Sequence, residues 1–235
     1  MARFSSFLLL LLTALMAAPA APHAAPLEGT LRQAQTEERL TTGEADGIRA
    51  SIDQARERGL PTAPLTAKVE EGLAKRVRPA TIIQALDAIR EDYAFARDAL
   101  RRSGAEPTPE DIIRTGDSLR LGLRRVELTE MAKLNPPPPM LATAARARAA
   151  LNTIDFPAVL SGDILRQGLS LGSLTPGWEQ LFRVAQRTRD AGMPDDAVAS
   201  AAARVLADGG GPAEVLQELG LTGRDTRHGP GEATK

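Results

Sequence analysis

The segment PATIIQALDAIREDYAFARDAL, residues 79–100, decides the fold class. Its apolar residues recur at alternating intervals of four and three, which places them on one face of an α-helix. These residues are Ile82, Leu86, Ile89, Tyr93, Ala96 and Leu100. Pro79 suits a first helical position, and Gly104 follows the end of the segment. We therefore predict a long helix whose apolar seam packs inside the molecule, with pairing to another subunit as the alternative.

Similar signals predict helices along most of the chain. Thr41 and Glu44 have the spacing of a capping box, and Thr108-Pro109 followed by two acidic residues marks another helix start. One amphipathic helix is expected from Thr108 to about Val126. The proline run at 136–139 is expected to be a stiff, non-helical spacer. Further helices are predicted at about residues 41–58, 64–74, 140–151, 156–169, 175–191, 194–207 and 212–219.

We interpret two segments of the chain as copies of an internal repeat, with chance similarity between short amphipathic helices in an Ala/Leu-rich chain as the alternative. Residues 59–86 align without a gap on residues 192–219, with eight identities in 28 positions. The shared features are a Gly-x-Pro turn, a short helix, a break and a helix that begins with proline. No stretch alternates apolar and polar residues as a strand would. We therefore predict an all-α fold, an array of short helical hairpins with a degenerate repeat, forming a right-angled bundle or a short solenoid.

The N-terminus has the features of a secretory signal peptide. Arg3 precedes a nearly uninterrupted apolar run at 7–16, and small residues follow. We predict cleavage near Ala24, with an uncleaved anchor as the alternative, and a location in the periplasm or outside the cell. No later segment is apolar enough to span a membrane. The predicted organisation is a signal peptide at 1–24, a flexible leader at 25–40, one helical repeat half at 41–134, a proline-rich spacer at 135–140, a second half at 141–220 and a disordered tail at 221–235.

The composition excludes several chemistries. The 235 residues include 29 basic and 30 acidic side chains but no cysteine. Disulfides, thiolate nucleophiles and cysteine-ligated zinc are thereby ruled out. Once the signal peptide is removed, His228 in the tail is the one remaining histidine, so the folded body lacks the commonest metal ligands and the commonest general base. We expect no cofactor and no metal. The near-neutral balance gives no general attraction to nucleic acid.

Two short stretches resemble a catalytic set. Gly116-Asp117-Ser118-Leu119 resembles the nucleophile block of the GDSL esterases, and residues 225–228 repeat the Asp-x-x-His spacing of that family. The resemblance implies Ser118 as nucleophile, His228 as base and Asp225 as the acid that orients the imidazole. That family carries its serine just after the first strand of an α/β sheet, whereas Ser118 lies mid-chain in an amphipathic helical pattern. We therefore interpret Ser118 as a helix-surface residue and keep a small GDSL-like serine hydrolase as the alternative.

Two groups of residues are candidates for binding. Basic residues outnumber acidic ones between 114 and 148, and a patch for an acidic partner is one interpretation, while a solvated helix face is the other. Trp178 and Phe182 lie one helical turn apart, either as core or as an exposed aromatic anchor. The residues proposed for binding are Arg114, Arg120, Arg124, Arg125, Trp178 and Phe182.

By exclusion, these observations favour an exported, non-enzymatic helical scaffold or adaptor. Its expected partner is an unidentified envelope or secreted protein rather than a nucleic acid, and self-association is a further option. A chaperone-like or inhibitor-like protein that binds its partners through an apolar groove is another alternative.

Overall fold

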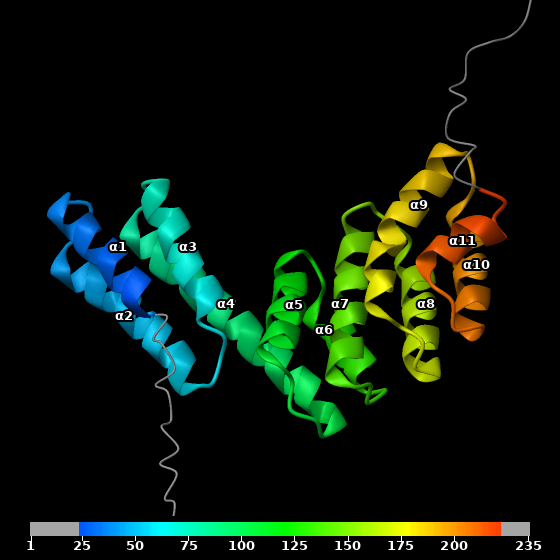
Figure 1. The fold of residues 1–235 in the computed structure, drawn as a ribbon, viewed down its shortest axis with the longest axis horizontal. Helices are drawn as coiled ribbons and strands as arrows, with labels where there is room; N and C mark the ends of the chain where they lie inside the picture. The colour runs from blue at the N-terminus through cyan, green and yellow to red at the C-terminus, as the bar shows by residue number, and fades with distance from the viewer. Residues whose placement is uncertain (1–23, 222–235) are drawn as a thin grey trace, which may run out of the picture.

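The computed structural model of the chain describes residues 24–221. In this range there are eleven α-helices, two short 3-10 turns and no strand, which confirms the predicted all-α class. The helices form an elongated array that runs from α1 to α11 (Figure 1). The elements are α1 Ala24–Thr36, α2 Thr42–Glu57, α3 Ala63–Ala74, α4 Pro79–Leu100, η1 Arg101–Ser103, α5 Pro109–Arg120, α6 Arg125–Ala132, α7 Pro138–Asn152, α8 Ala158–Leu171, η2 Pro176–Gln180, α9 Leu181–Asp190, α10 Asp195–Ala207 and α11 Pro212–Glu218.

The seam of residues 79–100 lies inside the molecule. All six predicted seam residues on α4 are at most 3% exposed. The helix packs against α2 and α3 on the N-terminal side and against α5 on the other, so it joins neighbouring hairpins (Figure 1). The seam is therefore intramolecular core, and its surface is not available for pairing with another subunit.

The break between the two helices of the aligned repeat falls at the same place in both copies. The first helix ends at Ala74 in one copy and Ala207 in the other, and the second begins at Pro79 and Pro212. Between them, Arg76 and Gly209 both have positive φ, at 55° and 73°. The next residue is Val77 in one copy and Gly210 in the other, and its backbone N–H donates to the carbonyl oxygen five residues earlier in the chain. The donor–acceptor distances are 2.9 Å for Val77 and 2.8 Å for Gly210. The match thus extends to the geometry that ends the first helix.

The helix α5 ends in the same way. Gly122 has φ of 99°, and the Leu123 N–H donates to the Ser118 carbonyl at 3.0 Å. The single helix predicted from 108 to 126 is therefore wrong, since α5 stops at Arg120 and a separate α6 begins at Arg125. Glycine at the left-handed position allows this stop without strain from a side chain.

Two predicted non-helical segments are wrong. The expected flexible leader, residues 25–40, holds most of α1, whose Leu27, Leu31 and Ala34 are buried in the core. The expected spacer, residues 135–140, is only partly non-helical because α7 begins at Pro138. Proline is tolerated in the first turn of a helix, where no intrahelical partner awaits its missing N–H. Residues 1–23, which hold nearly all of the predicted signal peptide, and residues 222–235 lie outside the described range.

Among the described residues, the core consists of two apolar clusters that meet on α7. Leu141, Ala145 and Ala149 belong to the N-terminal cluster, and Ala147 and Leu151 to the C-terminal one. α7 contributes small side chains to both, which lets it lie between neighbours on two sides. It contacts α5 on one side and η2, α8 and α9 on the other.

Candidate functional site: an apolar cleft between α6 and α8

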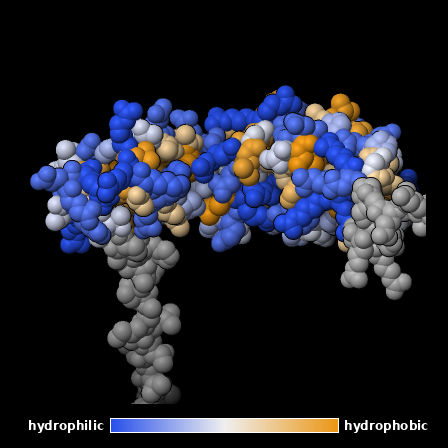
Figure 2. Space-filling model, turned by 90° about the horizontal axis from the view of Figure 1, so that it is seen from above, coloured by the Kyte–Doolittle hydropathy of each residue, from blue (hydrophilic) through white to orange (hydrophobic). Residues whose placement is uncertain are grey.

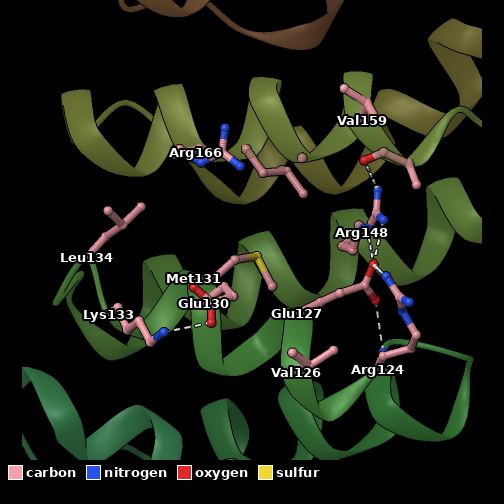
Figure 3. Close-up of a pocket in the computed structure, with 13 residues that line it drawn as sticks. Arg124, Val126, Glu127, Glu130, Met131, Lys133, Leu134, Arg148, Val159 and Arg166 are labelled. Atoms are coloured by element: carbon pink, nitrogen blue, oxygen red, sulfur yellow. Dashed lines mark hydrogen bonds and ion pairs between the residues drawn. The ribbon is translucent and has the colours of Figure 1, made fainter.

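A cleft of about 540 Å³ lies between α6 and α8 (Figure 3). Its residues come from these two helices, from the residues just before and after α6, and from α7: Arg124, Val126, Glu127, Glu130, Met131, Lys133, Leu134, Arg148, Ala158, Val159, Gly162, Leu165 and Arg166. α6 packs on α4 and α7, and α8 packs on α7 and α10, so α7 underlies the space between the walls.

Exposed apolar side chains gather at this cleft. Of the five large hydrophobic residues that are exposed in the described range, Val126, Leu134 and Val159 line it. Val159 is 72% exposed and Val126 is 58% exposed. The face seen in Figure 2 carries only small apolar patches within a largely hydrophilic surface. A concentration of apolar side chains in one hollow is the usual mark of a binding surface, because exposed hydrophobic residues are otherwise scattered singly.

One end of the cleft is built around Glu127. Its Oε1 accepts from Arg148 Nη2 at 2.5 Å and from Arg124 Nη2 at 3.0 Å, while Oε2 accepts from the Arg124 backbone N–H at 3.0 Å. The guanidinium of Arg148, from α7, is 6% exposed and also donates to the Ala158 carbonyl and the Ser161 hydroxyl. Arg148 therefore ties α7 to both walls of the cleft (Figure 3).

This arrangement changes the titration of Glu127. Burial raises the pKa of its carboxyl group, but the hydrogen bonds from Arg124 and Arg148 outweigh burial and bring the pKa down to about 2. The carboxylate is thus ionised at any pH near neutrality. It is shared by two guanidinium groups, so this end of the cleft keeps an excess of positive charge.

The predicted basic patch is mostly neutralised by ion pairs, two of them with acids from outside the segment. Arg114 forms an ion pair with Glu179 of η2, and Arg125 forms one with Asp92 of α4 at 3.0 Å while its guanidinium lies over the ring of Phe95. Arg120 pairs with Asp117 at 3.4 Å. Of the four arginines predicted for binding, Arg124 alone lines the cleft, and its side chain is 69% exposed.

The aromatic candidates lie away from the cleft. Trp178 is fully buried, and its Nε1 donates to the Gly210 carbonyl at 3.3 Å. The interpretation of Trp178 as an exposed anchor is therefore wrong, because its indole belongs to the C-terminal core cluster. Phe182 is half-buried against the same cluster, with Arg183 stacked over its ring.

The four residues that resemble the esterase block have packing roles in α5. Ser118 is fully buried, so its interpretation as a helix-surface residue is wrong, and its hydroxyl donates to the Arg114 carbonyl at 2.7 Å. Ser118 has the same position in α5 that Gly72 has in α3. The backbone carbonyl of each residue accepts the hydrogen bond that closes the end of its helix. Asp117 accepts from the Tyr93 hydroxyl at 3.2 Å, and Leu119 packs against the core. Asp225 and His228 lie outside the described residues.

Gly116 completes this contact. A Cβ added there would overlap the ring of Tyr93, so the glycine allows α4 and α5 to approach closely. Burial, the Asp117 charge and the bond to Asp117 together raise the pKa of the Tyr93 hydroxyl well above its usual range.

Within residues 24–221, no group of three or more His, Cys, Asp or Glu side chains is arranged to hold a metal ion, and no helix is both long and apolar enough to cross a membrane. Comparisons with protein-family models, with curated proteins and with solved structures gave no match.

Proposed function

We propose that the chain is an exported, non-enzymatic helical adaptor that binds a protein partner in the cleft between α6 and α8. The observation that carries this proposal is the concentration of Val126, Leu134 and Val159 in one hollow with charged groups at its ends. Export rests on the signal-peptide pattern of the sequence. The open cleft also suits the inhibitor-like or chaperone-like variant of the same idea.

The hydrolase alternative has weaker support. A serine nucleophile needs an exposed hydroxyl beside a base, whereas Ser118 is fully buried and already donates to a backbone carbonyl within its own helix. A Ser118→Ala variant should therefore keep whatever partner binding the protein has. An esterase activity of the purified protein that disappears in Ser118→Ala, or in a chain truncated after Gly220, would overturn the adaptor proposal.

Site-specific photo-crosslinking in the native host tests the adaptor proposal directly. A photoreactive amino acid at Val159 should trap a discrete partner. The same group at Leu171, which is 54% exposed on the same helix but outside the cleft, should not. The Val159 product should disappear when Val126→Glu is introduced across the cleft. Equal trapping at both positions, or trapping that survives Val126→Glu, would contradict the proposal.

A further inference from the structure

We propose that the occupant of the cleft is an amphipathic helix of a partner protein that lies antiparallel to α6 and α8, with its acidic C-terminal end beside Arg124. This inference rests on the proposed function and names the chemistry of the partner. It starts from the shape of the site and from the way charge is distributed along it.

The shape suits a helix. Two helices form the walls and α7 lies beneath (Figure 3), and the cleft is open to solvent. The apolar side chains Val126 and Leu134 lie at successive places along the α6 wall, and Val159 and Leu165 along the α8 wall. An amphipathic helix fits such a groove by placing an apolar stripe on the floor while its other face stays in water. The part of α8 that lines the cleft runs from Ala158 to Arg166, and α6 has eight residues, so an occupant of about two to three turns matches the length of the walls.

The ends of the cleft differ in charge. Arg124 and Val159 lie toward one end, and Leu134, Lys133 and Arg166 lie toward the other (Figure 3). At the second end the charges are paired one to one, Lys133 with Glu130 and Arg166 with Asp163. At the first end Arg124 and Arg148 share the single carboxylate of Glu127. A negative group of the occupant is therefore favoured at the Arg124 end.

The dipole of α8 acts in the same direction, whereas Glu127 already caps the first turn of α6. Both α6 and α8 begin at the Arg124 end of the cleft (Figure 3). The first turn of α8 holds no acidic residue and has no side-chain cap, so nothing in that turn offsets its positive end. The C-terminal end of an incoming helix is negative, and antiparallel docking places it there. Charge and dipole thus select the same orientation.

The C-terminal segment of this chain, which lies outside the described range, does not have the composition that the cleft requires. Residues 222–235 contain Ala233 as their one aliphatic side chain, so they cannot fill an apolar floor. Within residues 24–221, two exposed large hydrophobic residues lie outside the cleft, Leu121 and Leu171, and they do not extend its lining. The cleft's apolar surface therefore ends at its rim, as expected for a narrow ligand such as one helix.

Fluorescence anisotropy with designed peptides tests the proposal on the full chain. The probes are 14-residue amphipathic helices with the same leucine stripe that carry three glutamates at the C-terminal end, three glutamates at the N-terminal end, or three lysines at the C-terminal end. We expect the first peptide to bind at least about tenfold more tightly than the other two. Arg124→Glu should reverse the preference between glutamate and lysine at the C-terminal end.

Controls separate docking from general charge effects. Arg56→Glu changes an exposed arginine of α2 that is remote from the cleft, and it should leave all three affinities unchanged. Val126→Glu should abolish binding of the first peptide, while circular dichroism checks that the fold is retained. A spin label at the peptide's C-terminus should broaden the NMR signals of Val159 more than those of Leu134.

Equal binding of the three peptides, or an unchanged preference in Arg124→Glu, would overturn the inference. It would also be overturned if dodecanoate occupied the cleft in preference to the peptides, or if the protein formed a dimer in sedimentation that Val126→Glu dissociates. The last two would identify an acyl chain or a second copy as the occupant. If the peptides fail while the Val159 crosslink still traps a partner, the adaptor function stands and only the chemistry of its partner is wrong.

Discussion

Replacing Gly116 by alanine tests whether the esterase-like block serves helix packing. The added methyl group would overlap the ring of Tyr93, which is fully buried on α4. Overpacking of this kind costs about 1–3 kcal/mol. Displacing the ring would also strain the bond from Tyr93 to Asp117, worth about 1 kcal/mol. The higher helix propensity of alanine stabilises the fold by up to about 1 kcal/mol and offsets part of this loss. We therefore expect Gly116→Ala to lower the free energy of unfolding by about 1–3 kcal/mol.

The assay is urea unfolding followed by far-UV circular dichroism, with Gly29→Ala as the matched control. Gly29 lies inside α1, and nothing stands within 4 Å of a Cβ added there. This control should gain up to about 1 kcal/mol, since only the propensity effect remains.

A double-mutant cycle identifies the partner of the added methyl group. The Tyr93→Leu change opens space, so Gly116→Ala should cost less in that background than in the wild type. If Gly116→Ala is as stable as Gly29→Ala, or if its cost is the same in the Tyr93→Leu background, then the packing explanation of this block is wrong.

Three further predictions concern single residues. Thr115→Val should be neutral or stabilising by up to about 1 kcal/mol in urea unfolding, because Oγ1 is buried with no hydrogen-bond partner among the described residues; a clear loss would contradict this. Arg76→Gly should stabilise the fold by about 0.5–1 kcal/mol, because the arginine has φ of 55°; Lys75→Gly, at a residue with negative φ, is the control and should destabilise. The pKa of Glu127 is lowered to about 2, so its contribution of up to about 3 kcal/mol is present above pH 4.5 and lost as the pH falls toward 2. Glu127→Gln should leave the buried Arg148 uncompensated, destabilise the protein by about 3 kcal/mol at neutral pH and flatten this acid limb; an unchanged limb would refute the assignment.

Helices with an uninterrupted apolar period could be predicted from the sequence. The seam of α4 is an example, because every residue at its alternating spacing is buried. α1 escaped prediction although Leu27, Leu31 and Ala34 have the same spacing, since Pro26 and Gly29 suggested a loose segment. Proline in a first turn and a glycine facing solvent are both compatible with a helix, so the apolar spacing was the better guide.

The division between α5 and α6 was harder to predict. Leu119, Leu123 and Val126 keep helical spacing across the break, so periodicity alone indicates one helix. Gly122 was the available signal, because it occupies the position after the helix end that Gly209 occupies in the aligned repeat. The cleft depends on this break, so the residues that line it could not be predicted from the sequence.

The charge pattern of the cleft could not be predicted from a local count. Seven basic residues lie between 114 and 148, but two of their acidic partners, Asp92 and Glu179, come from outside that segment. Arg148 meets Glu127 across 21 residues of sequence. Ion pairs formed by packing, rather than the composition of one segment, determine which cations remain in excess.

The cleft occurs beside a hairpin whose second helix differs from that of the hairpin of α3 and α4. α3 and α5 each have 12 residues, and each is followed by the next helix after the same number of intervening residues. The helices that follow differ, since α4 has 22 residues and α6 has only eight. Asn135 has φ of 52° and precedes Pro136. Proline disfavours helical geometry at the residue before it, so α6 cannot continue as α4 does. The short α6 leaves the space above α7 open and keeps Arg148 at the base of the cleft, where it binds both walls. The hairpin of α5 and α6 thus provides a binding surface because its short second helix leaves the space above α7 open, which is why we assign the function to this hairpin and not to the repeat as a whole.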